Sequence, residues 1–333
     1  MAMKLKSFDI VGLFGHWRLK SNLDPKVNIL TGDNGSFKTN LIRLIRDFLS
    51  QTLKDTNIER CVLNFIDGDD NISLYYRHFK DSLLSLKKTQ NDELLQALAA
   101  QVESDLKDAN DKTLSERILN ADITAYKKNG GNIKPKDFKN AAHVDFVSTF
   151  DIPQKSKNDK DSFLDETLSD LEKDYAYYMS DLAQQLKDVL SRNVQDRSDN
   201  IRNIYNSIYS TNNKFLSIIN DSFKSTGKEI DTKRSELHFL VDGDRLTTRQ
   251  LSSGEKQLLI IMLTVLLERG QEFILLMDEP EISLHLDWQS HLIDNILSLN
   301  PNCQIVMTSH SPGILLRGWE QYTIQMSSIT EKL

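Results

Sequence analysis

The chain has 333 residues, 39% hydrophobic and 27% charged, a balance typical of globular proteins and unlike that of collagen-like or disordered chains. Its 41 Lys and Arg residues against 48 Asp and Glu give a net charge of −7, which provides no general basic field to attract nucleic acid. The N-terminus shows no small-residue cleavage site, the longest apolar run covers only residues 258–267, and the two cysteines match no metal or redox spacing. These features exclude membrane-spanning, secreted and disulfide-framework proteins, and we expect a cytoplasmic protein.

The first 79 residues are rich in strand signals. Short β-leaning runs alternate with Gly, Asn, Asp and Pro, and the run at 26–30 leads through a Gly-containing turn into a segment of helical periodicity at 40–53. Two further runs, 61–67 and 71–79, flank Gly68-Asp69-Asp70, a sequence that predicts a β-hairpin.

The middle of the chain has a different texture, because Gly and Pro become scarce and charged residues mix with Leu. Two stretches, 81–109 and 162–193, have the spacing of amphipathic helices, and a strand-like run lies between them. We therefore predict a helical insertion over residues 80–234, with a strand at 143–150 returning to the main sheet. The apolar stripe of the second helix indicates core packing or a helical hairpin, because no strict heptad persists. The stripe consists of Leu164, Leu168, Leu171, Tyr175, Tyr178 and Leu182.

Strand and helix patterns alternate again after Ser235. Strand-like runs at 236–243, 272–278 and 303–309 are separated by an apolar helix pattern and by a second, amphipathic one. This alternation is typical of a largely parallel sheet covered by helices. We predict one α/β domain that is split in sequence into residues 1–79 and 235–333.

A candidate phosphate-binding loop follows the run at 26–30. The pattern G-x-x-x-x-G-K-[ST] is met at Gly32, Lys38 and Thr39, whereas Phe37 stands where the second Gly is usual. In such a loop, backbone N–H groups and the helix N-terminus meet the phosphates, and the Thr hydroxyl binds Mg²⁺. An ordinary Asn-Gly turn is the alternative, and Phe37 raises the question whether hydrolysis is fast. The predicted ATP-binding residues are Gly32, Asn34, Gly35, Ser36, Phe37, Lys38, Thr39 and Asn40.

The apolar strand pattern at 272–278 ends in two carboxylates. Asp278 and Glu279 stand where one can hold Mg²⁺ and the next can polarise an attacking water. We expect Glu279 to be the catalytic base of an ATPase, with Asp278 and Thr39 as the ligands of the metal ion.

Two more segments carry a family resemblance. Residues 251–257, Leu-Ser-Ser-Gly-Glu-Lys-Gln, resemble the signature motif of ABC-type ATPases, in which a helix N-terminus binds the γ-phosphate held by the opposite subunit. The resemblance implies nucleotide contacts from Ser252, Ser253, Gly254 and Glu255, whereas simple helix capping by the serines is the alternative. His310 resembles the family's switch histidine, which contacts the γ-phosphate.

The stretch from Asp278 to His285, with Trp288 and Gln289, is similar to the DEPExxLHPxWQ segment of soluble ABC-type ATPases related to RecF, SMC heads and OLD-family proteins. The resemblance covers about 1–79 and 235–326 and identifies the chain as an AAA-family ATP-binding protein of this branch. It implies an α/β ABC-type ATPase head, in which a P-loop sheet and an antiparallel β subdomain carry a helical insertion. Gln154 is a candidate for the family's Mg²⁺-binding glutamine, although a surface Gln after Pro153 fits equally well.

The helical insertion contains clusters of lysine between Lys127 and Lys160, with acidic residues interspersed. A protein-docking surface is favoured there over a nucleic-acid site. The chain stops soon after the last strand of the sheet, so we expect any effector to be a separate protein rather than a nuclease domain of this chain.

The resemblance implies a dimer or larger homo-oligomer that sandwiches ATP and Mg²⁺ between its copies and acts as a nucleotide-driven switch. Proteins of this kind occur in bacterial anti-phage defence systems, and we expect the ATPase or sensor component of one. Two alternatives stay open. The first is a scaffold that binds ATP with little turnover, and the second is a DNA-repair or SMC-like head that acts on DNA.

Overall fold

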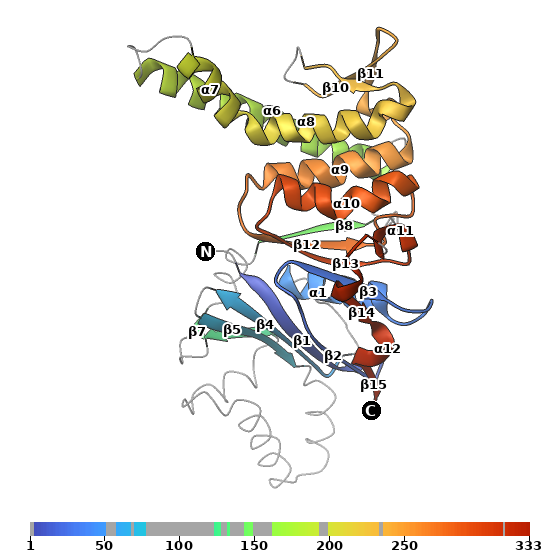
Figure 1. The fold of residues 1–333 in the computed structure, drawn as a ribbon. Helices are drawn as coiled ribbons and strands as arrows, with labels where there is room; N and C mark the ends of the chain where they lie inside the picture. Colours follow the sequence, from blue (N-terminus) through green and yellow to red (C-terminus); the bar gives the residue numbers. More distant parts are fainter. Residues whose placement is uncertain are drawn as a thin grey trace, which may run out of the picture.

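The computed structural model describes residues 3–50, 58–67, 70–77, 123–127, 132–133, 143–148, 162–192, 199–232, 236–315 and 317–333 (Figure 1). The helix expected at 81–109, the candidate Gln154 and the lysines from Lys128 to Lys160 lie outside the described residues.

A five-stranded, entirely parallel sheet forms the centre of the molecule, in the order β14-β3-β13-β12-β8. Its three inner strands, β3 (Val27–Thr31), β12 (Phe273–Asp278) and β13 (Cys303–Thr308), are buried along their whole length. Continuous apolar runs of this kind are typical of parallel strands that are covered on both faces. The edges are β8 (Val144–Ser148) and β14 (Thr323–Gln325).

Alternate side chains of β12 face different cores, because successive residues of a strand point to opposite sides of the sheet. Ile274 and Leu276 pack with α1, whereas Leu275 and Met277 pack with α9 and α10 on the other face. The sheet therefore lies between α1 on one face and α9 and α10 on the other (Figure 1). These helices are α1 (Lys38–Leu49), α9 (Ser253–Leu267) and α10 (Leu286–Leu299).

An antiparallel sheet of seven strands packs on the outer side of α1, in the order β15-β2-β1-β4-β5-β6-β7. β4 and β5 form the predicted hairpin, with Asp67 opposite Asp70. β6 and β7 come from the range expected to be a helical insertion, and the β-branched and aromatic residues of β6 favour pairing with β5. The strands are β1 (Lys4–Leu13), β2 (Trp17–Asn22), β4 (Arg60–Asp67), β5 (Asp70–Arg77), β6 (Ile123–Lys127), β7 (Asn132–Ile133) and β15 (Thr330–Lys332).

The 30-residue helix α6 (Phe163–Arg192) packs over α9. Leu168, Tyr175, Tyr178 and Leu182 are buried in the same core cluster as α9, so the apolar stripe serves core packing. Its neighbours are α7 (Asp199–Ile208) and α8 (Ser210–Phe223).

A small separate sheet lies beside α8, in the order β11-β10-β9. The strand-like run at 236–243 becomes β10 of this sheet and pairs antiparallel with both neighbours, so it does not join the parallel sheet as its chain position suggested. The strands are β9 (Glu229–Ile230), β10 (His238–Val241) and β11 (Asp244–Thr247). The remaining short helices are η1 (Lys224–Thr226), η2 (Thr248–Gln250), α11 (Pro312–Leu315), η3 (Glu320–Tyr322) and α12 (Met326–Ile329).

Within the ranges given above, every helix is too short or too polar to cross a bilayer.

Candidate nucleotide site

The loop between β3 and α1 holds the predicted phosphate-binding residues. Gly32 has φ +152° and Gly35 has φ +84°, conformations that favour glycine. A Cβ on Gly32 would lie 2.8 Å from Ser36 Oγ, so a larger residue here would also force the Ser36 side chain to move. Asp33, Asn34 and Gly35 are exposed at the tip of the loop.

Phe37 occupies the place of the second motif glycine and adopts the left-handed conformation, with φ 70° and ψ 11°. This conformation costs a non-glycine residue about 1–2 kcal/mol. The Phe37 ring packs against Phe14 and Trp17, with ring centroids 5.7 Å and 5.5 Å apart, and these contacts offset the cost. A bulky residue thus takes the backbone form that the motif needs at this position.

Two substitutions of Phe37 test this description. Phe37→Ala removes the aromatic contacts but keeps the left-handed strain, whereas Phe37→Gly removes both. We expect both variants to be less stable than wild type and the Gly variant to be about 1 kcal/mol more stable than the Ala variant. Urea denaturation measures the difference, and an Ala variant at least as stable as the Gly variant would contradict the left-handed conformation.

Lys38 begins α1 and folds back over the loop. Its Nζ donates hydrogen bonds to the carbonyl oxygens of Gly32 and Asp33, at 2.8 and 3.0 Å, and the residue is only 5% exposed. Burial, the largest influence, lowers the pKa of Lys38, although the carboxylates of Glu279, Asp33 and Asp278 act in the opposite direction. The loop therefore encloses the ammonium group of Lys38 at the end of β3, where it can contact a bound phosphate.

Asp278 lies at the carboxyl end of β12 and is fully buried. Its Oδ1 accepts hydrogen bonds from Thr39 Oγ1 at 3.0 Å and from Thr308 Oγ1 at 2.9 Å, and Arg43 Nη2 lies 3.7 Å from its Oδ2. These contacts of Asp278 join α1, β12 and β13. Hydroxyl and carboxylate oxygens are ligands that Mg²⁺ prefers, so Thr39 and Asp278 fit the role of metal ligands.

Glu279 and His310 meet at the ends of neighbouring strands. His310 Nε2 lies 3.6 Å from Glu279 Oε1, and the backbone N–H of Glu279 donates to Thr308 Oγ1 at 2.8 Å. Glu279 has a left-handed backbone, with φ 47°, and its side chain is 17% exposed. This partly exposed carboxylate can accept a proton from water, and the adjacent imidazole can contact a phosphate oxygen.

Glu281 is a part of the site to which the sequence analysis assigned no role. Its buried Oε1 accepts hydrogen bonds from Ser309 Oγ at 2.6 Å and from the His310 N–H at 2.9 Å. Burial raises the pKa of Glu281, although the hydrogen bonds from Ser309 and His310 act in the opposite direction. Glu281 thus positions the backbone that carries His310. It is the second Glu of the quoted DEPExxLH resemblance, and this is the signal that could have identified it.

Ser252 begins α9 with a capping box. The N–H of Glu255 donates to Ser252 Oγ at 3.3 Å, and the N–H of Ser252 donates to Glu255 Oε2 at 2.8 Å. Ser252 therefore caps the helix, and Ser252 and Ser253 are both exposed at the helix N-terminus. Capping and anion binding are compatible there, because the first N–H groups of a helix still point outward.

Glu255 differs from the two serines. It is 1% exposed, and its Oε1 accepts hydrogen bonds from Lys228 Nζ at 2.8 Å and Thr226 Oγ1 at 3.0 Å. Burial alone would raise the pKa of Glu255, but the hydrogen bonds from Lys228, Ser252 and Thr226 outweigh it and lower that pKa. The carboxylate is thus engaged inside the chain, and the structure does not present it at the surface as a nucleotide contact would require.

Gly254 packs against the segment that follows Glu279. A Cβ at this glycine would lie 2.2 Å from the carbonyl oxygen of Ser283. The structure therefore forms two groups: one joins the loop of Lys38 and Thr39 to the strand ends, and the other places Ser252, Ser253 and Gly254 beside Ser283.

The loop at the end of β3, the paired carboxylates at the end of β12 and the histidine at the end of β13 thus lie at one edge of the parallel sheet. Residues 27–316 match the family described as "AAA domain, putative AbiEii toxin, Type IV TA system", and the chain belongs to this family.

The known proteins that are similar to the chain include two relatives from defence systems and a solved SMC head. The retron Ec83 probable ATPase of Escherichia coli is 32% identical over 125 residues, which cover 33% of this chain and 23% of that protein. Septu protein PtuA of Bacillus thuringiensis is 24% identical over 336 residues, covering 93% of this chain and 72% of that protein. The structure of an SmcHead bound to the C-winged helix domain of ScpA aligns with TM-score 0.52 and 11% identity, over 94% of this chain and 91% of the other. The last similarity shows a shared fold.

Proposed function

We propose that this protein binds and hydrolyses ATP with Mg²⁺, using the group that joins the P-loop to the ends of β12 and β13. One observation carries the proposal. Thr39 and Asp278, 239 residues apart in the chain, share a hydrogen bond of 3.0 Å, so the phosphate-binding loop and the paired carboxylates act on one point in space.

Each residue of the group has a role that its environment suits. Lys38 and the loop N–H groups bind the phosphates, Thr39 and Asp278 hold Mg²⁺, Glu279 accepts the proton of the attacking water, and His310 contacts the γ-phosphate. Bound Mg²⁺ supplies charge neutralisation at the β- and γ-phosphates. Gln154 keeps its candidate role as a further metal ligand.

The second group fits a symmetric dimer. Ser252 and Ser253 lie exposed at the N-terminus of the 15-residue helix α9, where the helix dipole favours an anion. Ile282 and Leu286, 57% and 67% exposed, lie on either side of Ser283 and offer apolar surface near this helix end. We infer that Ser252, Ser253 and Gly254 of one copy face the ATP held by a second copy, so that ATP closes the dimer and hydrolysis opens it.

The wider role we propose is that of the ATPase component of a bacterial anti-phage defence system with a separate effector protein. The similarity to a retron ATPase and to Septu protein PtuA supports this role. It rests on relatives, whereas the ATPase proposal rests on the geometry of the site.

Phosphate release and ATP affinity test the ATPase proposal directly. Lys38→Ala removes the buried ammonium from the loop, and we expect it to lower turnover by at least about 100-fold and to weaken ATP binding. Lys173→Ala is the matched control, because Lys173 is an exposed surface lysine paired with Asp170. A wild-type protein that neither binds ATP nor releases phosphate would overturn the proposal, as would a Lys38 variant with wild-type turnover.

A further inference from the structure

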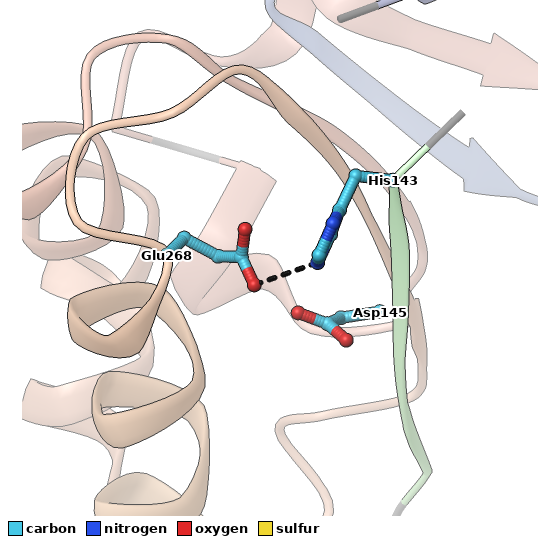
Figure 2. Close-up of side chains that lie close together, drawn as sticks. All are labelled: His143, Asp145 and Glu268. Atoms are coloured by element: carbon cyan, nitrogen blue, oxygen red, sulfur yellow. Dashed lines mark ion pairs between the residues drawn. The ribbon is translucent and has the colours of Figure 1, made fainter. Parts of the chain in front are cut away.

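Three side chains that commonly bind metals meet at one end of the parallel sheet. The opposite end carries the ATP group, by which we mean Lys38, Thr39, Asp278, Glu279 and His310. His143 and Asp145 come from the start of β8, and Glu268 follows α9 directly (Figure 2). His143 Nε2 lies 2.9 Å from Glu268 Oε1, and one ligand atom from each of the three residues lies within 4.8 Å of the others. Figure 2 shows the imidazole and both carboxylates directed toward one another.

Backbone contacts hold the cluster in place before any ligand binds. The carbonyl of His143 accepts a hydrogen bond from the N–H of Ile274 at 3.0 Å, which aligns β8 with β12. His143 and Asp145 are two residues apart on a strand, so their side chains lie on one face of the sheet. The turn after α9 is held by a hydrogen bond from Asn302 Nδ2 to the carbonyl of Gly270, at 2.8 Å.

The charges around the cluster favour a cation. The carboxylates of Asp145 and Glu268 lie close together, since one oxygen of each is within 4.8 Å of the other and of a ring nitrogen of His143. Burial and the negative charge of Asp145 both raise the pKa of Glu268, so the two carboxylates disfavour each other's charge. Glu268 also sits at the C-terminal end of α9, where the helix dipole is negative. A divalent cation would neutralise the two carboxylates that meet here.

We propose that His143, Asp145 and Glu268 bind a divalent transition-metal ion of the Zn²⁺ class. Imidazole nitrogen and carboxylate oxygen are both ligands of Zn²⁺, and a water molecule can complete the four-coordinate shell. Zn²⁺ bonds of about 2.0–2.2 Å in tetrahedral geometry place ligand atoms about 3.4 Å apart, so the observed cluster closes around the ion through small side-chain rotations. The imidazole is 51% exposed and leaves a path from solvent.

The ion would tie the start of the edge strand β8 to the end of α9. The other end of β8 reaches the ATP group, because Ser148 lies opposite Asp278 in the register of the sheet. A bound ion would therefore restrain the strand β8, whose other end lies beside the ATP group. This site is separate from the Mg²⁺ position at Thr39 and Asp278.

Calorimetric titration with Zn²⁺ alone tests the site on the full chain. We expect wild type to bind one Zn²⁺ per chain here, and His143→Ala and Glu268→Gln each to weaken that binding by at least 10-fold. His285→Ala is the matched control, since His285 and Asp287 form an exposed His–Asp pair with nitrogen and oxygen 3.6 Å apart. The proposal would be overturned if wild type and His143→Ala bound Zn²⁺ equally well. It would also be overturned if wild type bound no Zn²⁺ at 100 µM.

The melting temperature separates metal binding from a purely structural role. Glu268→Gln keeps the size and polarity of the side chain that faces His143, so its melting temperature without metal should stay close to that of wild type. Zn²⁺ should then raise the melting temperature of wild type alone. Equal Zn²⁺-induced shifts in wild type and both variants would mean that the cluster is only an internal ion pair.

Discussion

Glu279→Gln is expected to lower ATP turnover by about 10²–10⁴-fold while ATP binding persists. Glutamine has the size of glutamate but cannot accept the proton of the attacking water. The change leaves the backbone hydrogen bond from the Glu279 N–H to Thr308 intact, so the strand ends should keep their geometry. Because closed dimers would no longer open by hydrolysis, the variant should also accumulate as an ATP-bound dimer.

Phosphate release and gel filtration with ATP measure both effects. Glu272→Gln is the matched control, because Glu272 precedes β12 at the opposite end of the strand from the site. The result also decides between the two ATP-dependent functions. If wild type releases phosphate no faster than Glu279→Gln, the protein is a binding scaffold, and Phe37 in the loop is the first residue to examine.

Gly254→Ala is expected to destabilise the fold by about 3 kcal/mol or more. The added Cβ would lie 2.2 Å from the Ser283 carbonyl oxygen, and both atoms are tied to backbone that cannot rotate away. The start of α9 or the segment after Glu279 would have to move, and the second of these carries Glu281, which positions His310.

The midpoint of urea unfolding measures this loss, with Ser253→Ala as the control. Ser253 is exposed and adjacent in sequence, so its truncation should change stability by less than about 0.5 kcal/mol. A Gly254→Ala protein as stable as the Ser253 variant would show that α9 and residue 283 do not approach as described.

Contiguous motifs were the part of the site that could be predicted. One short loop contains Gly32, Lys38 and Thr39, and these residues could be predicted because a phosphate-binding loop needs a turn, a cation and a helix start in immediate succession. Asp278 and Glu279 follow the same logic at the end of a buried strand. The resemblance to ABC-type ATPases added His310 and the exposed serines of α9, and it led to the fold class.

Residues that act through long-range contacts were missed or misplaced. Glu255 was expected at the nucleotide, yet Lys228 and Thr226, distant in the chain, engage its carboxylate inside the protein. Glu281 had no predicted role, because its importance lies in hydrogen bonds to Ser309 and His310 on another strand. The local sequence around a carboxylate does not show which distant residue will donate a hydrogen bond to it.

Long-range contacts also decided features of the strands that the local sequence did not show. β6 lies in a range whose composition indicated helices, and its pairing with β5 decides its conformation. The cluster of His143, Asp145 and Glu268 depends on β8 entering the sheet beside β12, next to the end of a helix more than 120 residues later.

The sequence by itself determined the class of the protein, its P-loop and its paired carboxylates, because each is encoded by neighbouring residues whose chemistry requires adjacency. Only the tertiary structure decided the left-handed backbone held at Phe37, the inward placement of Glu255, the positioning role of Glu281 and the cluster at His143. Each of these depends on groups from separate parts of the chain, such as Phe14 and Trp17 beside Phe37 or Lys228 beside Glu255. Such proximity is a property of packing rather than of local sequence.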